Sequence, residues 1–262
     1  MAVHQKSPIL GVRIDRMSLD AAVRESRAAI QRQRPPLTFA CANPHSLSVA
    51  QEDTHFRNAL NSTDIVVVDG IGLSVMARLA RVPVGPRITG PDFFQALMRA
   101  SEHSGGARVF FFGSTPQVLD RLSRRFKEEY PQLTLCGTLS PPFGAWSAEE
   151  NTAMVSKINA AKPDVLWVGM TAPKQEKWVM DHRAALSVPV TGSIGAVFDF
   201  FAGTQPRAPA WVRGLGMEWV FRLMSEPRRL WRRYLVSSMK FVLLMLWREV
   251  LHIGAPRSGA QT

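Results

Sequence analysis

The chain has 262 residues, a formal net charge of +11 and only two cysteines, Cys41 and Cys136. This length permits one large domain, or one domain with an appendage. Two cysteines in apolar segments form neither a disulfide framework nor a zinc-binding pattern. No run of about 18 apolar residues occurs and no apolar leader precedes the first strand pattern, so neither a spanning helix nor a signal peptide is expected.

Apolar segments typical of buried strands alternate with helical patterns along residues 1–205. The expected strands are residues 9–14, 37–41, 65–68, 109–112, 133–136, 165–168 and 188–191. The expected helices are residues 19–32, 72–80, 92–103, 117–129, 148–160 and 173–186. Strands that alternate with helices of this length predict βαβ units. We therefore expect an α/β fold with a Rossmann-like, mainly parallel sheet flanked by helices.

Polar residues follow the first two inner strands of this pattern. Asn43 precedes a proline, and its side chain either orients a substrate hydroxyl or belongs to an Asn-Pro turn. Asp69 follows four apolar residues, where a carboxylate can act as a general base. Asp is also a favoured helix N-cap, and the sequence supports the two interpretations equally. Arg87 is either a cation placed before a helix start or a solvated arginine.

Residues 167–178 contain the end of a strand, Gly169, a short loop and a helix start. This helix start carries Lys174, Gln175 and Glu176 in consecutive positions. In open α/β sheets ligands bind beyond the carboxyl ends of the strands, and helix N-termini attract anions. A cation, an amide and a carboxylate at this place suit a polar, anionic ligand such as a nucleotide-sugar. The alternative is an ordinary helix start with a solvated, charged first turn.

Residues 206–262 differ in kind and form a basic, aromatic-rich helical appendage. From Arg207 to the end there are ten Lys/Arg against three Asp/Glu, a net charge of +7. One helix face is expected to carry the polar residues Arg229, Arg233, Ser237 and Lys240. A basic amphipathic helix with aromatic residues is typical of an interfacial membrane helix. The alternative is a helix that docks its apolar side on its own domain.

Several sequence patterns are absent. No Gly-x-Gly-x-x-Gly follows a strand, no P-loop occurs, and the six histidines lack metal-ligand spacing. No Asp-x-Asp pair is present to hold a divalent cation on a diphosphate, so arginines, lysines and helix ends would have to neutralise a leaving group. Neither a metal nor a cofactor is expected. The basic residues alternate with Trp and Leu instead of forming a stacking platform, so no nucleic acid partner is expected.

These motifs together resemble the WecG/TagA/CpsF group, glycosyltransferase family 26, from about residue 8 to about residue 235. The matching residues are Asn43-Pro44, Asp69-Gly70, Arg87-Ile-Thr-Gly90, Phe112-Gly113, Tyr130-Pro131, Ala172-Pro-Lys-Gln-Glu176, Phe198-Asp199, Gly203, Arg207-Ala-Pro-Ala-Trp211, Glu218-Trp-Val-Phe-Arg222 and Glu226-Pro-Arg-Arg229. The chain departs from the group at Cys41, where many members carry Thr, and at Val168-Gly-Met-Thr171.

The resemblance implies an inverting, metal-independent enzyme of cell-surface or exopolysaccharide biosynthesis. Such an enzyme moves N-acetylmannosamine, its uronic acid or glucose from a UDP-sugar donor to a polyprenyl-diphosphate-linked saccharide. It would work as a peripheral protein at the cytoplasmic face of the plasma membrane, with the C-terminal helix on the anionic membrane surface. Self-association into a homo-oligomer is left open. The alternative is a non-catalytic, membrane-bound scaffold that binds a nucleotide-sugar within a polysaccharide assembly complex.

The resemblance also implies roles for individual residues. Asp69 matches the catalytic base. The expected substrate-binding residues are Asn43, Arg87, Gly113, Lys174, Gln175, Glu176, Asp199, Arg222, Arg229 and Arg232. Among these, Asp199 matches a carboxylate on the nucleotide side, and the last three arginines match appendage residues that close over the diphosphate.

Overall fold

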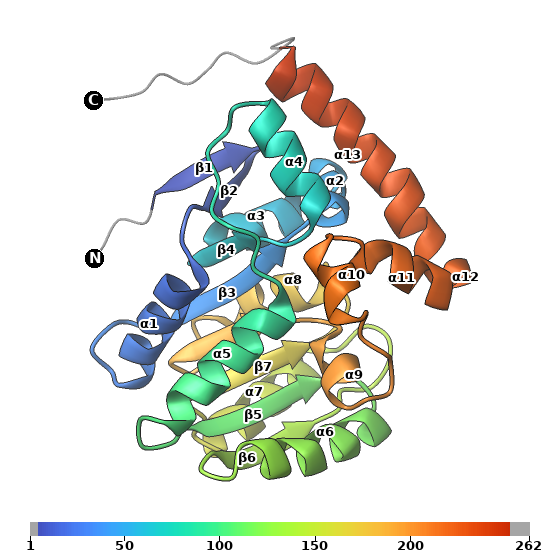
Figure 1. Ribbon diagram of the computed structural model, residues 1–262. Helices are drawn as coiled ribbons and strands as arrows, with labels where there is room; N and C mark the ends of the chain where they lie inside the picture. Colours follow the sequence, from blue (N-terminus) through green and yellow to red (C-terminus); the bar gives the residue numbers. More distant parts are fainter. Residues whose placement is uncertain (1–4, 252–262) are drawn as a thin grey trace.

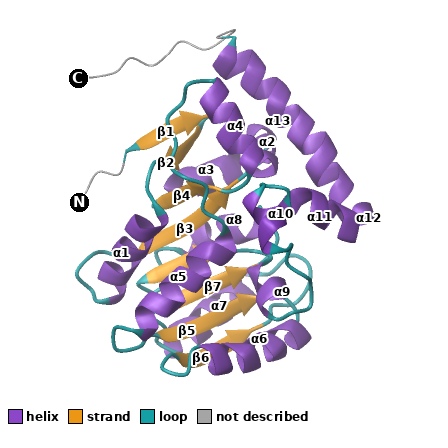
Figure 2. Cartoon of the chain, in the orientation of Figure 1, coloured by secondary structure: helices purple, strands orange, loops and turns teal. Residues whose placement is uncertain are grey.

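The computed structural model describes residues 5–251, apart from the side chains of Arg229, Arg233, Tyr234, Glu249 and Val250. A six-stranded parallel sheet forms the centre of the protein and helices cover both of its faces (Figures 1 and 2). This arrangement confirms the expected α/β fold. In spatial order the strands are β4 (Ile65–Val68), β3 (Leu37–Ala42), β8 (Val190–Ser193), β7 (Val165–Gly169), β5 (Arg108–Gly113) and β6 (Thr134–Leu139).

Side chains of the inner strands alternate between the two faces of the sheet, as the two-residue period of a strand requires. One face packs in a single hydrophobic cluster against α1 (Leu19–Ile30), α5 (Gly90–Glu102), α6 (Pro116–Glu129) and α9 (Val197–Phe201). On the other face, β3 and β4 pack against α2 (Pro44–Glu52), α3 (Thr54–Ser62) and α4 (Ile71–Leu79). Strands β5 and β7 pack on that face against α7 (Ala148–Ala160) and α8 (Lys174–His182).

Two glycines allow the largest core side chains to lie directly on the sheet. Trp167 of β7 is fully buried and lies so close to Gly192 of β8 that a Cβ atom on this glycine would collide with the indole ring. A Cβ atom on Gly169, at the end of β7, would likewise collide with the ring of Phe198 from α9. Because the rings occupy the space of the missing Cβ atoms, the carboxyl ends of β7 and β8 are packed tightly.

Several elements differ from those expected from sequence. The first expected strand, residues 9–14, is a hairpin of β1 (Lys6–Ile9) and β2 (Val12–Asp15), because Leu10 and Gly11 turn the chain with φ of 49° and 79°. The helices α2 and α3 were not predicted. In α2 the buried face contains Ser46 and Ser48, so the sequence lacks a continuous apolar stripe. The helix expected at 173–186 ends at His182.

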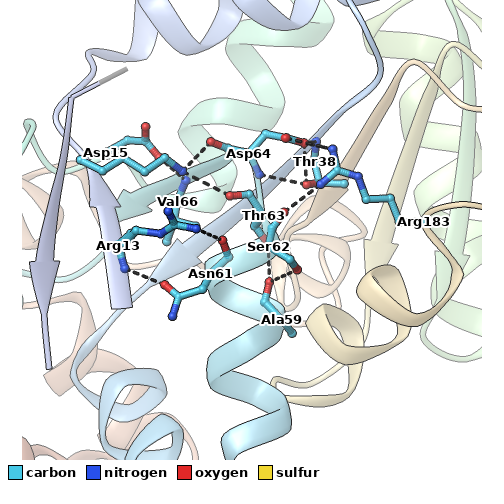
Figure 3. Close-up of polar contacts among 11 residues, drawn as sticks. Arg13, Asp15, Thr38, Ala59, Asn61, Ser62, Thr63, Asp64, Val66 and Arg183 are labelled. Atoms are coloured by element: carbon cyan, nitrogen blue, oxygen red, sulfur yellow. Dashed lines mark hydrogen bonds and ion pairs between the residues drawn. The ribbon is translucent and has the colours of Figure 1, made fainter. Parts of the chain in front are cut away.

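A polar network ties the amino ends of the strands together (Figure 3). The carboxylate of Asp64 accepts hydrogen bonds from the Thr38 backbone N–H at 2.7 Å and from Arg183, just after α8, at 2.8 Å. Lys6 of β1 donates to the Asp64 carbonyl at 2.7 Å and pairs with the buried Asp15 at 3.0 Å. The network therefore joins the hairpin, β3, β4 and α8 at the edge of the sheet opposite to the carboxyl ends.

The C-terminal appendage packs on the α/β domain. It comprises α10 (Ala210–Gly214), α11 (Glu218–Ser225), α12 (Pro227–Trp231), the π-helical turn η1 (Arg232–Val236), α13 (Ser237–Met245) and the π-helical turn η2 (Leu246–Val250). Helix α13 lies beside α2 and α4 (Figure 1). Its Phe241 and Met245 are buried in the cluster formed by β3, β4 and α2. Docking, which the sequence left as an alternative, is thus observed for one face of this helix.

The polar residues of α13 face the domain. The Ser237 carbonyl accepts a hydrogen bond from Ser48 of α2 at 2.7 Å, and Lys240 pairs with Glu52 at the end of α2. The side chains of Arg229 and Arg233, also expected on this face, lie outside the described residues. The face that the sequence assigned to a membrane surface therefore contacts α2 at Ser237 and Lys240.

Candidate active site

The carboxyl ends of β3 and β4 bring Asn43 and Asp69 together. Ala42 and Val68, the last residues of these strands, are in register, and the Asp69 N–H donates to the Ala42 carbonyl at 2.7 Å. A Cβ atom at Gly70 would lie 3.9 Å from the Cβ of Asn43, so the two loops are in contact. The parallel sheet thus places an amide and a carboxylate side by side at one edge.

Asn43 caps the helix that follows it. Its Oδ1 accepts a hydrogen bond from the Ser46 backbone N–H at 3.0 Å, and the Asn43 N–H donates to the Ser46 hydroxyl at 2.8 Å. This reciprocal pair is a capping box at the start of α2. The cap fixes the asparagine side chain at the strand end, whatever it contacts in a substrate.

Asp69 does not cap the helix that follows it. The N-cap of α4 is Gly70, with φ of 104°, and no side chain makes the cap hydrogen bond. The N-cap interpretation of Asp69 was therefore wrong. The general-base interpretation of Asp69 stays a prediction.

Three carboxylates act electrostatically on Cys41, near the end of β3. Burial raises the pKa of the Cys41 thiol well above its usual value, and the charges of Asp69, Glu176 and Asp92 raise it further. The three carboxylates come from the end of β4, from α8 and from α5. Carboxylates from separate parts of the chain thus make the surroundings of Cys41 negative, and this region is called the acidic site; Cys41 remains a thiol there at neutral pH.

Gln175 links the ends of β7 and β8 to the acidic site. Its Oε1 accepts hydrogen bonds from the backbone N–H groups of Gly195 at 3.0 Å and Met170 at 3.3 Å. Its Nε2 donates to Oε1 of Glu176 at 2.7 Å. Gln175 and Glu176 are only 5% and 4% exposed, so the interpretation as a solvated first turn was wrong for both.

Lys174 points to a different part of the protein. Its ammonium lies 3.5 Å from the centre of the Trp146 ring and donates to the Gly144 carbonyl at 2.7 Å. Burial lowers the pKa of this lysine. The structure therefore separates Lys174 from the neighbouring glutamine and glutamate, with which the sequence had grouped it.

Polar side-chain contacts hold α8 against α3. Lys177 pairs with Asp53, and its hydrogen bond lowers the pKa of that carboxyl group. One turn later, His55 and Asp181 lie 2.9 Å apart. These contacts hold the first turn of α8, and with it Gln175, relative to β3 and β4.

Two arginines connect the site to the appendage. Arg87 donates from Nη2 to the Arg213 carbonyl at 3.1 Å, and Arg207 donates to Oδ1 of Asp92 at 3.0 Å. Burial alone would raise the pKa of Asp92, but hydrogen bonds from Thr89 and Arg207 and the charge of Arg207 lower it overall. The sequence had not singled out Asp92 and Arg207 as a pair, and their separation of more than a hundred residues offered no local signal.

The remaining expected residues form a second group around α9 and the end of β5. Gly113 has φ of 122°, and a Cβ atom there would lie 2.5 Å from the Gly169 carbonyl oxygen, so packing alone demands glycine. The Asp199 carbonyl accepts the Thr204 N–H at 3.0 Å, which holds the turn toward the appendage. Arg222 lies over the ring of Phe200 at 5.2 Å, so an appendage arginine is brought to α9.

The outcome differs for the other two expected appendage arginines, Arg232 and Arg229. Arg232 is exposed, with its guanidinium 5.3 Å from the ring centre of Trp231. The side chain of Arg229 lies outside the described residues. The structure thus brings Arg222 to α9 and leaves Arg232 on the surface of the appendage.

The described residues contain neither a cluster of metal-binding side chains nor a helix that could cross a membrane. Within residues 5–251, no group of three or more His, Cys, Asp or Glu side chains is arranged to hold a metal ion. In the same range, no helix combines the length and hydrophobicity that crossing a bilayer would require. Metal-independent transfer stays a prediction.

Comparison with known proteins shows one consistent similarity. The family model described as "Glycosyl transferase WecG/TagA/CpsF family" matches residues 7–253. A Bacillus subtilis (strain 168) protein is 30% identical over 217 residues, which cover 83% of this chain and 82% of that protein. A Staphylococcus aureus (strain MW2) protein is 28% identical over 228 residues, or 87% of each chain. Both are named N-acetylglucosaminyldiphosphoundecaprenol N-acetyl-beta-D-mannosaminyltransferase.

Proposed function

The chain belongs to the WecG/TagA/CpsF family of glycosyltransferases, and on this premise we propose that it transfers a hexose derivative from UDP to a polyprenyl-diphosphate-linked saccharide. The names of the relatives make N-acetylmannosamine the first donor to test and N-acetylglucosaminyl-diphosphoundecaprenol the first acceptor. N-acetylmannosaminuronic acid and glucose are the other proposed donor sugars. The product would be an intermediate of a cell-surface or exopolysaccharide polymer.

The observation that carries this proposal is the position of Asp69. It follows β4 at the carboxyl edge of the sheet, in a loop that contacts the loop of Asn43. In the proposed reaction its carboxylate removes the proton of an acceptor hydroxyl. The hydroxyl oxygen then bonds to the anomeric carbon of the donor while the bond to UDP breaks on the opposite face, which inverts the configuration.

Arginines would neutralise the departing diphosphate in place of a metal. Arg222 is held over Phe200 of α9, the helix that also carries Asp199, and we propose that its guanidinium serves the nucleotide side. We propose that Arg229 and Arg232 join it when the substrate is bound. Guanidinium groups bind phosphate oxygens in a bidentate way, which suits a diphosphate leaving group.

We further propose that the protein works at the cytoplasmic face of the plasma membrane as a peripheral protein. A polyprenyl carrier stays in the bilayer, so the site has to be brought to it. The basic appendage, with nine Lys/Arg and three Glu between residues 206 and 251, suits an anionic membrane surface. Formation of a homo-oligomer is not required by this arrangement.

A panel of UDP-sugars tests the donor, acceptor and reaction together. Each donor is incubated with the lipid-linked acceptor, and the product is identified by mass. Asp69→Asn should lower transfer by about 10²- to 10⁴-fold, the usual contribution of a positioned base. Asp120→Asn, an identical change at an exposed site on α6, is the matched control.

The same assay separates the enzyme from a non-catalytic scaffold. A scaffold would bind a UDP-sugar and yield no product with any donor, whereas a transferase yields a product whose mass identifies the sugar. Full turnover by Asp69→Asn would remove Asp69 from the mechanism, even if transfer itself were found.

A further inference from the structure

Exposed hydrophobic side chains are concentrated on one part of the protein. Within residues 5–251, seventeen large hydrophobic side chains are exposed, and thirteen of them lie in residues 211–251. Three more lie on α4, and the last is Phe143. Clusters of this kind on a folded protein mark surfaces that contact another molecule or a membrane.

The exposed side chains of α4 form a stripe. Ile71, Val75 and Leu79 follow one another at four-residue intervals and are 39%, 48% and 60% exposed. Residues four apart on a helix lie on the same face. The opposite face of α4 is also apolar, since Leu73 and Met76 are buried against the core. A helix at a protein–water boundary normally has a polar outer face, so water alone does not account for this stripe.

Helix α13 carries a matching stripe. Met239 and Leu243 of α13 and Trp247 of the following turn η2 are also four residues apart, and they are 62%, 60% and 49% exposed. They lie apart from Phe241 and Met245, which are buried against α2. Helices α4 and α13 are in contact and lie side by side in Figure 1, so the two stripes belong to one region of the surface.

The charge of α4 and its flanking loop favours an anionic partner. Residues 70–91 contain Arg78, Arg81 and Arg87 and no Asp or Glu. Arg78 and Arg81 are exposed at the carboxyl end of α4, next to Leu79. Apolar side chains flanked by arginines match the boundary between acyl chains and anionic headgroups.

The stripe begins at the candidate active site. Ile71 is two residues after Asp69, and a Cβ atom at Gly216 of the appendage would lie 2.9 Å from the Cβ of Ile71. The segment that carries the proposed base, the stripe on α4 and the appendage are therefore in direct contact. Anything bound to the stripe is also next to the site.

We propose that α4 is a second membrane-contacting element, in which Ile71, Val75 and Leu79 enter an anionic bilayer while Arg78 and Arg81 contact its headgroups. This assignment extends the proposed function, which places the membrane contact on the appendage alone. It rests on that function only in supposing that the acceptor is lipid-linked. Contact through both helices would hold the mouth of the site, at Asp69, against the membrane surface.

Vesicle binding tests the proposal without any catalytic step. The protein is co-sedimented with vesicles of phosphatidylethanolamine and phosphatidylglycerol at high salt, where apolar insertion dominates. The double variant Val75→Ser/Leu79→Ser should bind about 10-fold or more weakly, because two partly inserted aliphatic side chains are lost. Phe143→Ser is the matched control, because Phe143 is 92% exposed and lies outside the patch. Equal binding by wild type and the double variant, with Tm unchanged, would overturn the proposal.

A site-specific probe covers the case in which the double variant is unstable. An environment-sensitive fluorophore is attached to Leu79→Cys or to Phe143→Cys. Wild-type protein serves as the blank, because burial raises the pKa of both native cysteines and slows their labelling. Emission should shift to the blue on vesicle addition for Leu79→Cys only.

Unchanged emission at Leu79→Cys, while the protein co-sediments, would show that only the appendage binds lipid and would refute the role of α4. If the stripe instead joins two copies of the chain, the double variant would change its oligomeric state and keep its vesicle binding. That result would also refute the membrane contact of α4. A failed sugar transfer would leave all these outcomes intact, so the proposed function and this inference fail separately.

Discussion

Replacing Gln175 with alanine should weaken both the fold and the site, because one side chain makes three hydrogen bonds there. The substitution removes the acceptor of the Gly195 and Met170 N–H groups and the donor to Glu176. Gln175 is buried, so bulk water cannot simply take over the hydrogen bonds that its side chain makes. Gln175 thereby holds the ends of β7 and β8 in place and orients Glu176 toward the acidic site.

The expected loss follows from these bonds. A hydrogen bond to a charged group such as Glu176 contributes about 1.5–3 kcal/mol to the stability of the fold. Each backbone N–H that is left without a partner costs about 1–3 kcal/mol where no water can reach it. Because Met170 and Gly195 are half-buried, water can reach part of this region, and we take about 1 kcal/mol for each. The sum is about 4 kcal/mol, which corresponds to a fall in Tm of roughly 8–16 °C for a protein of this size.

Thermal unfolding and the transfer assay check this prediction together. Gln117→Ala, at an exposed position on α6, is the control and should leave Tm within about 2 °C. Gln175→Glu keeps an acceptor for both N–H groups but sets a second carboxylate against Glu176. Like charges favour protonation, so this variant should gain stability relative to wild type as the pH falls from 7 to about 5. An equal Tm for Gln175→Ala and Gln117→Ala would refute the hydrogen-bond reasoning.

Three further predictions concern the appendage, a site ion pair and metals. Phe241→Ala should lower the free energy of unfolding by about 3–5 kcal/mol and speed proteolysis of α13, since the ring is buried against α2. Asp92→Asn should destabilise the protein at neutral pH, and the difference in Tm should shrink as the pH falls below about 4 and disappear only below the lowered pKa of Asp92, where the folded protein also protonates this carboxyl group. Transfer should survive EDTA; a loss that manganese or magnesium restores would contradict the arginine-based account of the leaving group.

The acidic site depends on contacts between distant parts of the chain. Asp69 and Asp92 both follow β4 in the chain, Glu176 follows β7, and all three act electrostatically on Cys41 of β3 because parallel strands end at the same edge. Arg207 then neutralises part of this charge from the start of the appendage. The site and the appendage are therefore coupled electrostatically as well as by packing.

The sequence alone determined the fold class and the edge at which the site lies. Residues 65–68 and 165–168 are runs of apolar residues, and the helices between strands show a helical period, so both could be recognised within short windows. The position of Asn43 and Asp69 at strand ends followed directly. The hairpin at residues 6–15 was missed because its turn includes the apolar Leu10, and α2 because serines occupy its buried face.

Only the tertiary structure decided what the polar side chains do. The sequence could not show that Gln175 binds the Gly195 backbone, that Lys174 turns to Trp146, or that Lys240 pairs with Glu52. Hydrophobic periodicity is a local property of the chain, and it specifies which segments become strands and helices. A hydrogen-bond or ion-pair partner nearly two hundred residues away is chosen by how those elements pack, and no local pattern encodes it.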